Sequence, residues 1–248
     1  MTRTALLLSL LLPAAPAAAQ TASTAPAAPS TAAAQAPWFV DVSSPAGLAG
    51  ASMQNAVWAD VNGDGWQDCL TAGTKAGANE VKLFLNEEKD GRRVFRDITA
   101  ESGVTAPPEG STVPRVGSFH VFGDVDNDGD LDLFSGMYCE FEKPKAVPGT
   151  ETPLKDAAGN IVYEKKDDGL RSEVFLNDGA GHFTRLKDSG VGNHAETSGS
   201  AAFVDYDKDG VLDLFVGNWY KEYGFTYVSY PSRLYRGLGG GRFEEVTE

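Results

Sequence analysis

Short apolar runs that alternate with polar residues recur along the chain from Trp38 onward. Examples are Phe39–Ser43, Leu83–Asn86, Val174–Asn177 and Leu214–Gly217, each close to Gly, Asn or Asp. Alternation with a period of two, between clusters of turn residues, predicts β-strands and hairpins. No stretch shows a convincing period of 3.6 residues. The pattern therefore predicts an all-β fold, with Phe39–Ser43 as an opening strand.

Two markers alternate along the chain and define an internal repeat. The first is an aspartate-rich segment that begins at Asp60, Asp124 and Asp205. The second marker carries an aromatic residue, which is Phe39, Phe95, Phe183 and Phe243. The middle repeat is longer than the others because of an insertion, residues 140–171, which is charged and contains Gly and Pro. We expect this insertion to be a surface loop.

Repeats of this length, with four short strands each, are typical of β-propeller blades. Closed propellers have roughly four to eight blades. The chain has fewer periods than that, and it stops at Glu248 inside the marker pattern. The prediction is a partial β-propeller of three four-stranded blades, a fragment of a larger propeller. An open arc of blades and closure by self-association are the alternatives.

The aspartate-rich segments follow the pattern D-x-[DN]-x-D-G-x-x-D. Positions 1, 3, 5 and 9 supply side-chain oxygens, position 7 supplies a backbone carbonyl, and Gly at position 6 permits a sharp turn. This donor set suits Ca²⁺ better than Mg²⁺, which prefers a rigid six-fold shell. The predicted ligands of three calcium ions are Asp60, Asn62, Asp64, Trp66 and Asp68; Asp124, Asp126, Asp128, Asp130 and Asp132; and Asp205, Asp207, Asp209, Val211 and Asp213.

The first half of each segment also matches an EF-hand loop, which requires Glu at position 12 and a flanking helix on each side. Position 12 is Thr71, Ser135 and Val216, and buried-strand patterns follow position 9. We therefore expect each loop to join two strands, with a structural calcium ion at the corner. Tight turns without an ion are the simpler alternative, but a turn does not need three or four acids at fixed spacing.

These residues resemble the FG-GAP/VCBS repeat family, whose calcium-loop propeller repeats also occur in integrin α-chains. The resemblance rests on Phe122-Gly123-Asp124 and on the closing segment Leu214–Gly217. The second marker, in Leu83–Asn86 and Phe95–Thr99, is similar to the ASPIC/UnbV and cartilage acidic protein subgroup. The resemblance implies a seven-bladed propeller and extracellular binding or adhesion rather than a defined reaction.

The first residues have the layout of a secretory signal peptide. Residues 1–19 contain Arg3, an apolar run too short to span a bilayer, and a small-residue end at Ala17–Ala19. Residues 20–36 are Ala, Pro, Ser and Thr with a few Gln, and predict a disordered linker, so the repeats occupy residues 37–248. We expect a secreted or periplasmic bacterial protein with no transmembrane segment.

The net charge of −14 disfavours binding to nucleic acid and favours binding to cations. The two cysteines, Cys69 and Cys139, either pair or remain buried thiols. No nucleophile elbow, zinc-protease motif or phosphate loop occurs, so we expect no catalysis. The partner is expected to be an extracellular protein or a glycan; the alternative function is the non-catalytic propeller domain of a larger secreted or carbohydrate-active enzyme. Seven aromatic residues form either a ligand platform or packing between blades: Tyr138, Trp219, Tyr220, Tyr223, Phe225, Tyr227 and Tyr230.

Overall fold

The computed structural model describes residues 39–51, 54–75, 78–107, 109, 112, 114–137, 143–164, 171–194, 196–220 and 229–248. Asp41–Glu248 form one compact unit. The expected signal peptide (1–19) and linker (20–36) lie outside the described residues, and so does Cys139. Cys69 is a buried free thiol, and burial raises its pKa to about 11.

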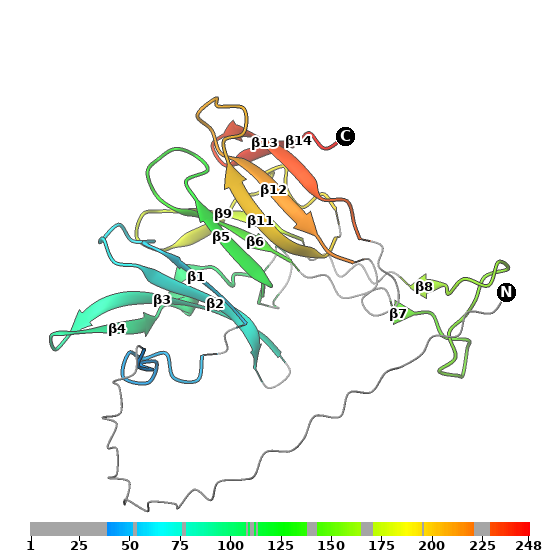
Figure 1. Cartoon of the computed structure of the whole chain (residues 1–248), viewed down its shortest axis with the longest axis horizontal. Helices are drawn as coiled ribbons and strands as arrows, with labels where there is room; N and C mark the ends of the chain where they lie inside the picture. The colour runs from blue at the N-terminus through cyan, green and yellow to red at the C-terminus, as the bar shows by residue number, and fades with distance from the viewer. Residues whose placement is uncertain are drawn as a thin grey trace, which may run out of the picture. The chain divides into compact units, whose positions relative to one another are not determined.

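The compact unit contains three four-stranded antiparallel sheets (Figure 1). The first has the order β1 (Asn55–Ala59), β2 (Asp68–Lys75), β3 (Ala78–Lys89) and β4 (Arg92–Asp97). The second has the order β10 (Phe183–Arg185), β9 (Glu173–Asn177), β6 (Asp132–Gly136) and β5 (Phe119–Gly123). The third has the order β11 (Ser198–Val204), β12 (Asp213–Asn218), β13 (Arg233–Gly239) and β14 (Arg242–Glu245). This architecture confirms the predicted all-β fold with three four-stranded blades.

The predicted opening strand over Phe39–Ser43 is wrong. These residues have no strand pairing, and turns follow directly. Asp41 is the cause, because its Oδ1 accepts a hydrogen bond from the Ser43 amide at 2.9 Å and so forms a local turn. Further along, the Ala46 carbonyl accepts a hydrogen bond from the Phe95 amide at 2.7 Å, so this segment reaches the edge strand β4 through one residue.

The insertion is more regular than the predicted loop. Within it, β7 (Lys143–Pro144) pairs with β8 (Tyr163–Glu164), and isolated bridges join Ala146 to Pro153 and Lys155 to Ile161. The sole helix in the described part of the chain is α1 (Thr99–Ser102), which has four residues. No helix in the described ranges has the length and apolarity that a membrane span needs.

Each sheet carries one pair of aromatic rings, contributed by its first and last strands in chain order. The pairs are Trp58 with Phe95, Phe122 with Phe183, and Phe203 with Phe243, with ring centroids 5.7, 6.1 and 6.3 Å apart. We call the face of a sheet that carries this pair its pair face, and the opposite face its back face. The pairs recur at equivalent positions, so the second marker in the sequence is a structural repeat.

The hydrophobic core lies between successive sheets. Leu70 and Leu83, on the back face of the first sheet, share one cluster with Leu133, which lies on the pair face of the second. The second cluster joins the back face of the second sheet to the pair face of the third; it contains Phe134 and Leu214. Back face against pair face is therefore the packing unit of this fold, as expected for neighbouring propeller blades.

Candidate metal centres

The three aspartate-rich segments are the corners that join β1 to β2, β5 to β6, and β11 to β12. Each corner connects two antiparallel strands of one sheet. This placement confirms the prediction that the loops join strands, and it removes the EF-hand alternative because no helix flanks any of the three corners.

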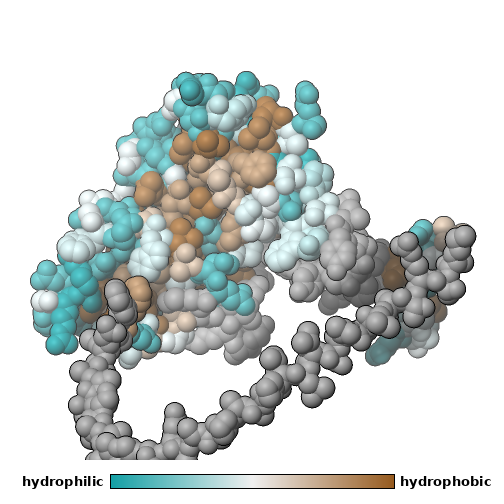
Figure 2. All heavy atoms as spheres, in the orientation of Figure 1, coloured by the Kyte–Doolittle hydropathy of each residue, from teal (hydrophilic) through white to brown (hydrophobic). Residues whose placement is uncertain are grey.

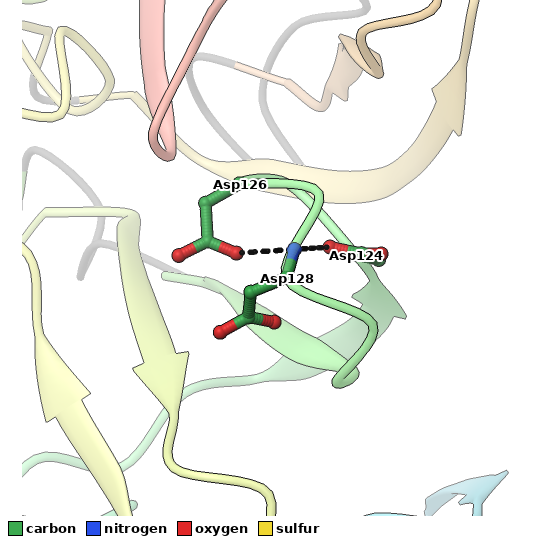
Figure 3. Close-up of side chains that lie close together, drawn as sticks. All are labelled: Asp124, Asp126 and Asp128. Atoms are coloured by element: carbon green, nitrogen blue, oxygen red, sulfur yellow. Dashed lines mark hydrogen bonds between the residues drawn. The ribbon is translucent and has the colours of Figure 1, made fainter.

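Backbone amides hold the first aspartate of each loop in place. In the second loop, Asp124 accepts hydrogen bonds from the amides of Asp128 and Gly129, both at 3.1 Å. The Asp128 amide also lies 3.3 Å from Asp126 Oδ1, so positions 1 and 3 bracket the same amide (Figure 3). The same bonds recur in the first and third loops. The loops are therefore ordered around their acids by their own backbone.

The carboxylates at positions 1, 3 and 5 converge in two of the loops. One oxygen from each of Asp124, Asp126 and Asp128 lies within 4.8 Å of the others. One oxygen from each of Asp205, Asp207 and Asp209 likewise lies within 4.8 Å of the others. In the first loop position 3 is an amide, and Asn62 Nδ2 donates to Asp64 Oδ2 at 3.2 Å. That loop therefore brings two carboxylates and one amide together.

The fourth residue of each loop adopts the left-handed conformation. It is Gly63, Asn127 and Lys208, with φ of 68°, 62° and 63°. This conformation suits Gly and is tolerated by Asn, whereas Lys pays a steric penalty there. Asn127 has a further role, because its Nδ2 donates to the Gly210 carbonyl at 3.1 Å and so links the second loop directly to the third.

The aspartate at position 9 has a role that the sequence analysis missed. Asp132 is fully buried; its Oδ2 accepts the Val125 amide and its Oδ1 accepts the Asn177 amide, both at 2.9 Å. Asp68 and Asp213 make the equivalent pairs of bonds. Each therefore clasps its own loop to the third strand of its sheet. The signal available in the sequence was an acid placed directly before a buried strand.

Two acids of the second corner, Asp126 and Asp132, carry an electrostatic cost in their charged form. Burial, and the neighbouring Asp128 carboxylate, raise the pKa of Asp126. Burial also raises the pKa of Asp132 to about 6, against the two amide bonds that lower it. A divalent cation would offset this cost, since it favours the charged form of every carboxylate around it.

The structure thus brings together positions 1, 3 and 5 of the predicted ligand sets. The aspartate at position 9 forms the clasp and remains a predicted ligand, as do the carbonyls of Trp66, Asp130 and Val211 at position 7. The Asp130 carboxylate lies against Gly179, in the turn after β9. Hard oxygen donors at this spacing fit calcium chemically.

The family model of the FG-GAP-like repeat matches residues 60–135 and 161–216, more than half of the 248 residues. The chain belongs to the FG-GAP-like repeat family. In this FG-GAP-like repeat protein, the first matched range runs from Asp60, the first residue of the first loop, to Ser135 in β6. The second matched range ends at Val216 in β12. The narrower similarity to the ASPIC/UnbV and cartilage acidic protein subgroup stays a prediction. No curated protein matches the chain.

The aromatic residues considered as a ligand platform are only partly described. Tyr138, Tyr223, Phe225 and Tyr227 lie outside the described residues. Trp219 and Tyr220 pack against each other, with ring centroids 5.9 Å apart. Both alternatives for this set, platform and packing, stay open.

Proposed function

We propose that this FG-GAP-like repeat protein is a secreted or periplasmic calcium-binding module that acts in extracellular binding or adhesion, with calcium in a structural role. The observation that carries the proposal is the recurrence of one acid-lined hairpin corner in three successive sheets. In the second and third corners, one oxygen from each of three carboxylates lies within 4.8 Å of the other two. Such groups repel one another unless a cation lies among them.

The residues that would hold the ions are those at positions 1, 3, 5 and 9 of each loop, together with the backbone carbonyl at position 7. Calcium bound there supplies charge neutralisation and a rigid corner. The chain's own contribution is to orient the acids before the ion arrives, through amide bonds such as the two that Asp124 accepts. Because the corners lie at the start of buried strands, ion binding would stabilise the sheets by mass action, by about 2.7 kcal/mol for each site at calcium one hundredfold above its Kd.

The proposal favours binding over catalysis. The FG-GAP-like repeat is a structural unit, and the acids that cluster in this chain are assigned to cation binding. The extracytoplasmic location rests on residues 1–19, whose composition fits a signal peptide. Recovery of the mature protein with an N-terminus near Ala19 would support that assignment, and an intact Met1 in the exported protein would contradict it.

The test is a calorimetric titration of the calcium-free chain with Ca²⁺, with Mg²⁺ as the competing ion. We expect three sites and a Tm that falls when a chelator is added. Asp207→Ala should remove the third site alone, and Asn62→Asp should tighten the first by about tenfold, because ligand charge tunes calcium affinity. An exposed acid outside the loops, Glu151→Ala, is the matched control. A chain that binds no calcium, or an Asp207→Ala variant that still binds three ions, would end the proposal.

A further inference from the structure

The back face of the third sheet is exposed, although the same face is buried in the first two sheets. In the first sheet the register places Val57, Leu70 and Leu83 side by side on this face. In the third sheet the equivalent register places Ala202, Phe215 and Leu234 together. Leu70 is 1% exposed, whereas its counterpart Phe215 is 44% exposed. A face built to pack against another sheet is thus open to solvent.

The loop above this face shows the same contrast. Position 2 of the loop is Val61 in the first sheet and Val125 in the second, and both are buried. In the third sheet it is Tyr206, which is 47% exposed, and the neighbouring Val204 is 44% exposed. Figure 2 shows apolar side chains gathered over β11 and β12, where Val204 and Phe215 lie. The exposed residues therefore form one surface.

Backbone hydrogen bonding marks the same surface as a docking site. The Val61 carbonyl accepts a hydrogen bond from Asn177 Nδ2 of the second sheet at 2.8 Å. The Val125 carbonyl accepts one from the Gly241 amide of the third sheet at 3.1 Å. Each loop is thus held by the sheet that comes next. Within the described residues, no sheet follows the third to hold Tyr206 in this way.

The first sheet presents the complementary surface. Its pair face carries Trp58, which is 52% exposed. The counterparts of Trp58 are Phe122 and Phe203, and both pack into the cores between sheets. The fit is close, because a Cβ on Gly123 would lie only 2.7 Å from the Phe203 ring. The pair face of the first sheet is therefore exposed at Trp58, beside the buried Cys69 and Phe84 of the same face, with no preceding sheet among the described residues.

We propose that the back face of the third sheet binds the pair face of the first sheet of a second copy of this chain. The chain already makes this type of contact twice, between its own first and second sheets and between its second and third. Contact between two different faces generates a ring where the rotation closes. The described residues of two copies bring six four-stranded sheets together, a number within the four to eight of closed propellers.

The test is sedimentation velocity of the full chain over a range of concentrations, in calcium and in chelator. We expect a dimer that Phe215→Asp and Trp58→Asp each convert to a monomer. A mixture of the two variants should dimerise again, because each supplies the face that the other lacks. Phe39→Asp is the matched control: Phe39 is 93% exposed and belongs to neither sheet, so this variant should remain dimeric.

A wild-type chain that remains monomeric at its highest soluble concentration overturns the proposal. A Trp58→Asp variant that still dimerises also overturns it, since the back face would then bind something other than the pair face. Far-ultraviolet circular dichroism and the unfolding midpoint of each variant show whether it has folded. Because both replaced side chains are about half exposed, we expect folded monomers. If an aspartate variant does not fold, its loss of the dimer is not evidence for the interface. Phe215→Ser, which adds no charge to the surface, is then tested in its place.

Discussion

Gly190 provides a direct test of how closely the linker between the second and third sheets packs against the backbone of a strand. It precedes the third sheet, has φ of 82°, and lies against the backbone of Phe243 in β14. A Cβ at this position would overlap the Phe243 carbonyl oxygen and lie 3.0 Å from the carbonyl carbon. The adjacent hydrogen bond, from the Phe243 amide to the Ser189 carbonyl, is 2.7 Å long. Gly190→Ala therefore forces two backbone segments apart.

The cost of Gly190→Ala has three parts. The left-handed conformation costs an L-residue about 1–2 kcal/mol. Relieving the overlap costs about 1–3 kcal/mol, the usual range for overpacking. Weakening of the Ser189 to Phe243 hydrogen bond adds about 1 kcal/mol. We expect the free energy of unfolding to fall by about 3–6 kcal/mol, which is a large part of the stability of a typical domain.

Gly91→Ala is the matched control. Gly91 has φ of 73°, close to that of Gly190, but no neighbouring atom lies within 4 Å of its added Cβ. It therefore carries the backbone penalty alone, about 1–2 kcal/mol. Urea unfolding of both variants, followed by tryptophan fluorescence with unchanged m-values, gives the two free energies. If both variants lose the same free energy of unfolding, the close packing of Gly190 against Phe243 contributes nothing to stability, and the packing argument is wrong.

Three further predictions follow from buried or strained groups. Arg115→Met should lower the free energy of unfolding by about 1–3 kcal/mol, because Arg115 is 1% exposed and its loss removes a buried donor to the Ser135 carbonyl, while Arg185 still pairs with Glu173; chemical unfolding measures it. Lys208→Gly should raise the unfolding free energy of the calcium-free chain by about 0.5–1 kcal/mol, since it relieves the left-handed conformation at φ of 63°; a lower midpoint would contradict this. Burial raises the pKa of Asp97, but the hydrogen bond from Lys82 helps to hold this pKa below 3.8. The stability that Asp97 adds is therefore present above that value and is lost as the pH falls through the lower folded value; Asp97→Asn should flatten the acid limb of a Tm against pH profile.

The fold could be predicted from the sequence because its signal is local and repeated. Alternating apolar residues between turn residues specify strands, and the recurring loop at Asp60, Asp124 and Asp205 fixes where each sheet begins. The prediction of an opening strand was wrong because a local side-chain hydrogen bond overrides the alternating pattern. Phe39–Ser43 has the alternation of a strand, but Asp41 bonds the Ser43 amide and makes a turn.

The site was predicted in its residue types but not in all of its roles. Spacing along a loop determines which side chains can converge, so positions 1, 3 and 5 were predictable. The role of Asp132 depends on Asn177, which lies 45 residues away in the chain and reaches it only through the pairing of β6 with β9. The same holds for the bond from Asn127 to Gly210. Loop spacing carries no information about partners that sheet packing brings in.

The aspartate at position 9 of each corner and the aspartates earlier in the loop have different structural roles. Asp132 accepts hydrogen bonds from two backbone amides and so holds the loop to its sheet. Asp126 and Asp128 have fewer such partners, and burial together with their mutual repulsion raises the pKa of Asp126. Calcium would therefore act chiefly on the outer half of the corner, while the clasp keeps the strands in register. On this argument, removal of calcium loosens the loops between sheets, including the link from Asn127 to the third loop, before it unfolds the sheets themselves.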